Sequence, residues 1–472
     1  MNENQFLKSV FTQIENYLED VNDPKTLVSK KYKPENLSED FGIKIEDEPT
    51  GYNQISDYID RYLDYSVKTK SKQFHNQLFA GYNIPSLVGE FITALTNTSN
   101  YTFEASPLGT LMELELLRKM SEVAGFRANK GTFLTGGSNA NMIAMLCARQ
   151  EKFPEIKKNG IASLGILTIF VSEACHYSYE KAANVIGLGI KNVRYIKADS
   201  GGSLIPSELE KAIISSIDAG ETPIMIGATA GTTELGAFDP INQMREIANK
   251  YSVWLHVDGA WGGSILLSKK HKHLLSGIEK ADSMSWDPHK MMNVPLICSV
   301  LLVNNHSDIL AETVSTERGG YIFHKHELSD YDLGRSSIQC GKRVDSLKLW
   351  LAWKYFGDKG YEKNIDYLFD LASEVVEIIN EHPELEMMAE RKSLNVLFRY
   401  KKIKNKEIKD LNSYNLQIRN KLTGSGKALC NHCTVGGDFA FRLIVNNPEK
   451  TIEDFNHFFI YLDECKELID NM

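Results

Sequence analysis

A lysine preceded by proline and histidine closes a short apolar run, and its surroundings suggest chemistry. The run spans residues 281–292 and contains Pro288, His289 and Lys290. This pattern indicates a strand that brings one amine into a pocket. A buried lysine must find a partner or lose its proton, and lysines tuned in this way form Schiff bases with carbonyl compounds. On this run alone, a surface lysine that follows a strand remains the alternative.

Two glycines between an expected strand and an expected helix form a second candidate. The strand covers residues 132–134, and Gly136, Gly137 and Ser138 precede a helix over residues 140–153. Glycine lets backbone N–H groups approach an anion, and a helix N-terminus favours negative charge. The segment therefore suits a phosphate, although a plain strand-to-helix turn also explains it. It matches neither the dinucleotide-binding fingerprint nor a Walker loop.

An aspartate and a histidine follow two further expected strands. Asp258 follows the run 253–257, and His176 follows the run 166–171. Ligands bind beyond the carboxyl ends of strands in open α/β sheets, so both residues are candidates. A helix-capping or solvated aspartate and a structural histidine are the alternatives. Cys430 and Cys433 lack a second pair of ligands, and no metal site is expected there.

The elements that would position these residues lie between about residues 132 and 305. Short apolar runs alternate there with helical segments such as 207–218 and 240–251. This alternation predicts a mostly parallel sheet covered by helices. The polar residues before it suit an arm of helices that needs another surface to pack on. After it, a polar segment over 306–345 suits a mobile loop, and a helix over 344–356 leads into a smaller α/β domain.

Composition and charge narrow the class of protein. The 472 residues exceed one ordinary domain, and 42% hydrophobic and 24% charged residues are typical of a soluble globular protein. A formal net charge of −9 argues against a nucleic-acid binder. No apolar run reaches the roughly 20 residues that span a bilayer, and a signal-peptide pattern is missing. The 7 cysteines are odd in number and scattered, so a disulfide framework is not expected and a cytoplasmic location is.

The candidate residues together match the needs of one cofactor. A phosphate cradle, a Schiff-base lysine, an aspartate for a pyridinium nitrogen and a flat ring to stack on it are what pyridoxal 5′-phosphate requires. The chain resembles the group II pyridoxal-phosphate amino-acid decarboxylases, especially the glutamate and cysteine-sulfinate decarboxylase branch. The resemblance is nearly collinear from about Gln73 to Pro448. Its motifs lie at 76–81, 172–178, 228–233, 256–263, 286–292, 320–323, 338–341 and 441–443.

The resemblance implies a role for each matching residue. Lys290 would form the Schiff base, Asp258 would keep the pyridine nitrogen protonated, and His176 would stack on the ring. Tyr321 would protonate the substrate carbon after CO₂ leaves. The residues implied to hold the cofactor are Gly137, Ser138, His176, Thr229, Asp258, Ala260, Ser283, His289 and Lys290. Those implied to contact substrate carboxylates are Gln77 and Arg442.

The resemblance also implies pyridoxal-phosphate fold type I, which is an α/β fold with a mostly parallel seven-stranded sheet in its large domain. We expect an N-terminal helical arm over 1–75, the large cofactor-binding domain over 76–345 and a small C-terminal α/β domain over 346–472. A homodimer with the site at its interface is implied, with the arm wrapping the second subunit.

The expected reaction is α-decarboxylation of an acidic L-amino acid, which would be glutamate, aspartate or cysteine sulfinate. The 76–81 motif favours it, as does Arg442, whose guanidinium can hold a carboxylate bidentately. An aromatic amino acid or 2,4-diaminobutyrate is the alternative within the family, and another fold type I enzyme such as an aminotransferase is the alternative outside it. Asp287 stands where the relatives usually carry asparagine. Because a carboxylate there repels a phosphate unless it is protonated or turned away, Asp287 is not expected in the site.

Overall fold

The computed structural model describes residues 1–304, 308–316, 323, 327–401 and 410–471. Contacts within it group the chain into two compact units. The large unit comprises Tyr82–Phe369 and Glu390–Asn395, and the small unit comprises Met1–Gly81, Asp370–Ala389 and Val396–Met472. These limits differ from the domain boundaries expected at residues 75 and 345, and the three-domain division stays a prediction.

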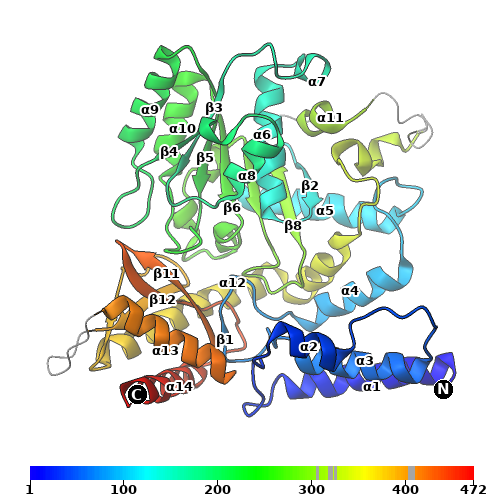
Figure 1. Cartoon of the computed structure of the whole chain (residues 1–472). Coiled ribbons are helices and arrows are strands. Elements are labelled where there is room, and N and C mark those ends of the chain that lie inside the picture. Colours follow the sequence, from blue (N-terminus) through cyan, green and yellow to red (C-terminus); the bar gives the residue numbers. More distant parts are fainter. Residues whose placement is uncertain (305–307, 317–322, 324–326, 402–409, 472) are drawn as a thin grey trace. The chain divides into compact units, whose positions relative to one another are not determined.

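A seven-stranded sheet forms the centre of the large unit (Figure 1), in the strand order β2-β8-β7-β6-β5-β3-β4. The pairs from β7 through β6, β5 and β3 to β4 are parallel, and β8 is antiparallel to both β7 and β2. The expected mostly parallel sheet is therefore confirmed. The strands are β2 (Lys130–Leu134), β3 (Leu167–Ser172), β4 (Val193–Ile196), β5 (Thr222–Thr229), β6 (Trp254–Gly259), β7 (Ser283–Trp286) and β8 (Ser299–Val303).

Helices between the strands cover this sheet. Helix α6 packs across β5 to β8, and α9 and α10 both pack against β5. Every residue of β3 and β6 is buried, as expected for parallel strands with covered faces. The helices of the large unit are α4 (Ile84–Thr96), α5 (Pro107–Ala124), α6 (Gly137–Lys152), α7 (Ile156–Asn159), α8 (Ser178–Val185), α9 (Pro206–Asp218), α10 (Ile241–Tyr251) and α11 (Ile309–Val314). Short 3₁₀ turns are η1 (Ile190–Asn192), η2 (Gly262–Leu267), η3 (Lys272–Leu275), η4 (Ile278–Lys280), η5 (Ser329–Tyr331) and η6 (Leu333–Ser336).

The sheet topology decides where the loops after the strands meet. Strands β2, β3, β5, β6 and β7 all run in one direction, because β8 alone among these seven strands reverses. Their carboxyl ends therefore share one edge of the sheet, which is where ligands bind in open α/β folds. Beyond the sheet, helix α12 (Asp345–Glu381) is interrupted at Gly357, whose φ is 60°. Glycine adopts this left-handed conformation readily, and the helix expected over 344–356 ends at this point.

The small unit contains a five-stranded sheet of order β1-β11-β12-β10-β9. The short strand β1 (Phe74–His75) pairs in parallel with β11 (Leu429–Val435), which is antiparallel to β12 (Asp438–Ile444). Strands β10 (Asn395–Tyr400) and β9 (Leu385–Met387) complete it, and helices α13 (Leu411–Ser425) and α14 (Ile452–Asp470) pack against each other. Buried Lys450 donates a hydrogen bond of 2.6 Å to the carbonyl oxygen of Phe74, which ties β1 to the segment before α14.

Three helices precede β1, namely α1 (Glu3–Asp20), α2 (Pro34–Phe41) and α3 (Tyr52–Tyr65). Helix α1 packs on α3, where the rings of Phe6 and Tyr52 stack with their centroids 4.8 Å apart. Neither α1 nor α2 contains a buried residue. Across the described residues, the chain forms no helix with the length and apolar character needed to cross a membrane.

Candidate active site

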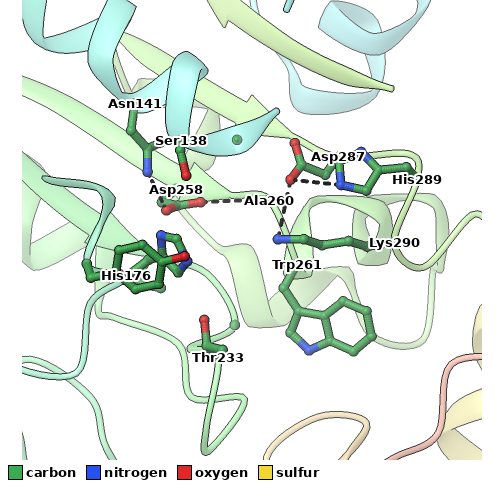
Figure 2. Close-up of a pocket in the computed structure, with 14 residues that line it drawn as sticks. Ser138, Asn141, His176, Thr233, Asp258, Ala260, Trp261, Asp287, His289 and Lys290 are labelled. Atoms are coloured by element: carbon green, nitrogen blue, oxygen red, sulfur yellow. Dashed lines mark hydrogen bonds and ion pairs between the residues drawn. The ribbon is translucent and has the colours of Figure 1, made fainter. Parts of the chain in front are cut away.

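A cavity of about 220 Å³ lies at the carboxyl edge of the large sheet (Figure 2). Segments that follow or end β2, β3, β5, β6 and β7 supply its walls. The lining residues are Gly137, Ser138, Asn141, His176, Tyr177, Thr229, Gly231, Thr233, Asp258, Ala260, Trp261, Asp287, His289 and Lys290. Residues separated by up to 153 positions (137 to 290) are thus brought together by the common direction of five strands.

Lys290 projects into this cavity from a turn directly after β7. Its backbone N–H donates to the carbonyl oxygen of Asp287 at 3.0 Å, which closes the turn. Its Nζ lies 3.3 Å from Asp287 Oδ2, and His289 Nε2 lies 3.6 Å from the same oxygen. The Lys290 side chain is 20% exposed. The structure therefore excludes the alternative of a surface lysine, and the amine faces the cavity as Figure 2 shows.

Asp258 ends inside the cavity with both carboxylate oxygens in hydrogen bonds. Oδ2 accepts from Asn141 Nδ2 at 2.7 Å, and Oδ1 accepts from the backbone of Ala260 and from Ser285 Oγ at 3.1 Å each. Burial by itself raises the pKa of Asp258, but the Lys290 charge and the Asn141 hydrogen bond outweigh it, and the pKa lies below its usual value. Asp258 is therefore an anion that can stabilise a cation in the cavity.

The start of α6 forms a backbone cradle beside Asp287. Gly136 caps the helix with a φ of 122°, a conformation that favours glycine. A Cβ atom on Gly137 would lie 2.8 Å from Asp287 Oδ2 and 3.1 Å from Ala260 Cβ, so a larger residue would fill the cradle. The first N–H groups of a helix have no partner within it, and they carry partial positive charge. This end of the cavity suits an anionic group.

A neutral aromatic ring lines another wall. His176 Nδ1 accepts a hydrogen bond of 3.2 Å from the backbone N–H of Ser178, and burial is the main cause that lowers the pKa of His176. The imidazole is therefore neutral near pH 7, with its proton on Nε2. Its centroid lies 4.1 Å from that of the Tyr177 ring. A flat, uncharged ring in this position can stack on a planar ligand.

One buried hydroxyl in the cavity wall lacks a partner. Thr229 Oγ1 makes no hydrogen bond to any other described residue, although it is buried. The backbone N–H of Thr229 is held by Asp239 Oδ2 at 2.7 Å, and the same carboxylate accepts from the N–H of Leu204 at 2.7 Å. Burial raises the pKa of Asp239 to about 6. Because buried polar groups in proteins are normally paired, the Thr229 hydroxyl indicates that a ligand completes this wall.

The cavity gathers most of the residues that the sequence singled out. The predicted residues that line it are Gly137, Ser138, His176, Thr229, Asp258, Ala260, His289 and Lys290. Ser283 does not line it, because Ser283 begins β7 and the cavity lies beyond the other end of that strand. Gln77 and Arg442 belong to the small unit, where Arg442 Nη2 donates to the carbonyl oxygen of Asn76 at 3.2 Å. Tyr321 lies outside the described residues.

Six lining residues were not predicted: Asn141, Tyr177, Gly231, Thr233, Trp261 and Asp287. Asn141 carries a signal in the sequence, because it lies four residues after Gly137 and so on the same face of α6. Asp287 was left outside the expected site, yet its carboxylate is not turned away: Oδ2 faces Lys290, and Oδ1 accepts a hydrogen bond from Ser299 Oγ. In the described part of the chain, no cluster of three or more His, Cys, Asp or Glu could hold a metal ion.

Comparison with known proteins identifies the family. The model of the pyridoxal-dependent decarboxylase conserved domain matches residues 34–401. Human cysteine sulfinic acid decarboxylase is 41% identical over 379 residues, which cover 79% of this chain and 77% of that protein. The chain belongs to the pyridoxal-dependent decarboxylases. The mouse relative of the same name is 41% identical over 368 residues, covering 78% of this chain and 74% of the relative. The crystal structure of mouse CSAD in apo form matches with a TM-score of 0.94 and 35% identity over 98% of each chain.

The predicted membership of the group II decarboxylases, in the glutamate and cysteine-sulfinate branch, is thus confirmed, as are fold type I and pyridoxal 5′-phosphate as the cofactor. The residues of this decarboxylase fit that cofactor. Gly137 leaves room for an anionic group because glycine has no Cβ atom. The unpaired Thr229 hydroxyl offers a polar contact on another wall. An amine, an anionic carboxylate and a neutral ring complete the set.

Proposed function

We propose that this decarboxylase removes the α-carboxylate of an acidic L-amino acid as CO₂, with glutamate, aspartate and cysteine sulfinate as the candidate substrates. The observation that carries the proposal is the 41% identity to human cysteine sulfinic acid decarboxylase over 79% of the chain. The cavity residues support it, because the groups proposed to hold the cofactor, namely an amine, a carboxylate, a neutral ring and the start of a helix, all line one cavity.

Pyridoxal 5′-phosphate, when bound, supplies an electron sink for the pair released as the Cα–carboxylate bond breaks. In our proposal Lys290 presents its amine to the carbonyl carbon of the cofactor. Asp258 holds a proton on the ring nitrogen, and its lowered pKa supports this role because the charge is present near pH 7. The N–H groups at the start of α6, with Ser138 and His289, hold the phosphate.

Two further residues would contact the cofactor ring and the substrate carbon. His176, whose imidazole is held by the backbone N–H of Ser178, would stack on the cofactor ring and help to fix its plane. Tyr321 delivers a proton to Cα after CO₂ has left; this residue lies outside the described part of the chain, so its role rests on the family resemblance alone.

The substrate's second acidic group requires a cation, and Arg442 is proposed for it together with Gln77. Within the small unit, Arg442 donates to the backbone of Asn76, and Asn446 Nδ2 donates to the carbonyl oxygen of Gln77 at 3.0 Å. The end of β12 therefore holds the segment that begins the 76–81 motif. Arg442 is 6% exposed, and a buried guanidinium can bind a carboxylate with little loss of side-chain entropy.

A substrate panel tests the proposal directly. Purified protein loaded with cofactor is offered glutamate, aspartate, cysteine sulfinate, DOPA and 2,4-diaminobutyrate, and CO₂ release is measured. We expect release from at least one acidic amino acid. Release from DOPA or diaminobutyrate, with none from the acidic set, would overturn the acidic assignment, and formation of a second amino acid from an added keto acid would indicate transamination instead.

Two variants connect this result to the residues. Lys290→Ala should abolish both CO₂ release and the visible absorbance of bound cofactor. Arg442→Gln should raise KM for acidic substrates by about 10- to 100-fold, because a charge-assisted hydrogen bond is lost, while cofactor absorbance is retained. An unchanged KM in Arg442→Gln would show that Arg442 does not bind the substrate.

We also propose a homodimer with the site at its interface and a cytoplasmic location. Apolar side chains stand exposed along α4 and at the start of α5, among them Leu95 at 79% and Leu108 at 69% exposure. Exposed apolar stripes of this kind mark protein interfaces, and the absence of buried residues from α1 and α2 indicates that these helices need a partner surface. The 7 cysteines are free, which supports a reducing compartment.

Sedimentation of paired variants tests the dimer. Leu95→Glu combined with Leu108→Glu should yield monomers without decarboxylase activity. Ile460→Glu, which alters an apolar residue 52% exposed on α14, is the matched control and should remain dimeric. A wild-type monomer, or a dimer that survives the double substitution, would contradict the proposed interface. Cell fractionation tests the location.

A further inference from the structure

A series of buried hydrogen bonds leads away from the cavity behind Asp258. Trp254 Nε1 donates to Ser283 Oγ at 2.9 Å, and Ser283 Oγ lies 2.8 Å from His256 Nδ1. His256 Nε2 lies 3.0 Å from Asn141 Oδ1, and Asn141 Nδ2 donates to Asp258 Oδ2 at 2.7 Å. Each of these five side chains is at most 6% exposed. We call this the hydrogen-bond series.

The direction of every bond in the series follows from its two ends. The indole of Trp254 can only donate, and the ionised carboxylate of Asp258 can only accept. The amide of Asn141 must therefore direct its NH₂ group at Asp258. Its second N–H donates to Ser178 Oγ, with Nδ2 and Oγ 3.0 Å apart, which leaves Oδ1 as an acceptor facing His256. A reversed amide would place two oxygens against each other at Asp258.

This orientation requires one particular form of His256. Because Asn141 Oδ1 accepts, the imidazole carries its proton on Nε2. Burial is the main cause that lowers the pKa of His256 to about 4, so near neutral pH the other nitrogen, Nδ1, is an acceptor. Ser283 then donates its hydroxyl hydrogen to Nδ1 and accepts from Trp254. All four bonds run in one direction, with each donor nearer Trp254 than its acceptor.

We infer that His256 is a positioning residue for the cofactor, which acts through Asn141 to hold Asp258 ionised and directed at the ring nitrogen. His256 and Ser283 do not line the cavity, and neither is placed to touch the ring. The inference rests on the family's cofactor and goes beyond the proposed substrate, so a failed substrate assignment would leave it standing. The inference also gives Ser283 a role away from the cavity. Its hydroxyl donates to His256 Nδ1 and so helps to hold the imidazole in place.

The unloaded protein allows a first test. Histidines are labelled with ¹⁵N, and the His256 signals are assigned by their loss in His256→Gln. Near neutral pH we expect the neutral imidazole with its proton on Nε2, which the two ring-nitrogen shifts distinguish. A ring that carries its only proton on Nδ1 would overturn the inference, because Nε2 could then not donate to Asn141 Oδ1.

Cofactor binding allows a second test. His256→Leu removes the Nε2–H donor, and we expect about tenfold or greater weakening of pyridoxal 5′-phosphate binding, measured by titration of the unloaded protein. The value of kcat should fall with little change in KM. His256→Gln, whose amide can place a donor near the same point, should recover most of both losses. Equal losses in the two variants, in proteins with wild-type circular dichroism, would show a packing role only and overturn the inference.

The position of each residue in the series predicts a gradient. Cofactor binding should weaken most in Asn141→Leu, less in His256→Leu, less again in Ser283→Ala and least in Trp254→Phe, because each step is further from Asp258. Ser216→Ala is the matched control for Ser283→Ala: its hydroxyl is also buried, and it lies 2.9 Å from Thr168 Oγ1 outside the series. Losses in Ser216→Ala equal to those in Ser283→Ala would contradict the gradient.

Discussion

Two buried carboxylates, Asp258 and Asp287, line the same cavity, and their surroundings differ. Asp258 accepts hydrogen bonds from an amide, a backbone N–H and a hydroxyl, all of them neutral donors. Asp287 instead faces the ammonium group of Lys290 at 3.3 Å. Neutral donors stabilise a carboxylate without cancelling its charge, whereas an ion pair largely cancels it. The charge of Asp258 thus remains available to a ligand, and that of Asp287 is directed at the chain's own lysine.

The largest effect should come from Asp258. We expect Asp258→Asn to lower kcat by about 10²- to 10³-fold, because the anion that stabilises the charged ring nitrogen is lost. Steady-state decarboxylation with saturating cofactor measures this. Asp258→Glu, which keeps the charge, should lose less. A wild-type kcat in Asp258→Asn would show that the charge of Asp258 does not act on the cofactor. It would contradict the proposed difference between Asp258 and Asp287.

Burial of His256, which contacts Asp258 through Asn141, should make the free energy of unfolding depend on pH. His256 has a pKa near 4 when folded against 6.5 as its reference value, mainly through burial. Protonation therefore favours the unfolded chain, so this contribution to stability is complete above about pH 6.5 and is lost as the pH falls toward 4. The loss at about pH 5 should be about 2 kcal/mol. Urea unfolding of unloaded wild type and His256→Gln measures it, and parallel pH profiles of the two proteins would contradict it.

Removal of the charge of Asp287 should strengthen cofactor binding, whereas removal of the charge of Asp258 should impair catalysis. Asp287→Asn should tighten binding of pyridoxal 5′-phosphate by about tenfold, because it removes a negative charge beside the phosphate cradle. Titration of the unloaded protein with cofactor measures the change. Asp282→Asn is the control: Asp282 lies just before β7 and pairs with Arg245 at 2.8 Å, outside the cavity. Weaker binding in Asp287→Asn would show that the Lys290 pair matters more than the repulsion.

The smallest effect should come from the hydroxyl next to Asp287. Ser299 Oγ donates to Asp287 Oδ1, and this bond helps to fix the carboxylate beside the cradle. Ser299→Ala should therefore tighten cofactor binding only by about two- to threefold. The same titration applies. A larger change than in Asp287→Asn would mean that Ser299 contributes to the cradle in another way.

Much of the fold was accessible from periodicity, because buried parallel strands are short apolar runs with helices between them. The runs before His176 and Asp258 illustrate this: both are strands, and both residues line the cavity. Ser283 illustrates the limit. A motif gives only the order of residues along the chain. Ser283 is the first residue of β7, whereas the cavity lies beyond the last residue of that strand, so Ser283 does not line the cavity.

Asn141 and Asp287 show what pattern alone does not reveal. Asn141 is one polar residue in an otherwise ordinary helix, and its importance comes from contacts with His256 and Asp258, which lie on another element. Asp287 is not expected in the site from sequence, because a carboxylate repels a phosphate. In the structure Lys290 Nζ lies 3.3 Å from its Oδ2 and supplies a compensating charge.

The sequence by itself determined the alternation of strands and helices, the family of the protein and the lysine proposed to react, because these depend on local composition and on the order of motifs. The tertiary structure decided which side chains share the cavity and in which direction their hydrogen bonds run. The physical reason is that charge stabilisation depends on distances of a few ångströms between residues more than a hundred positions apart, and only the packing of β6, β7 and α6 sets those distances.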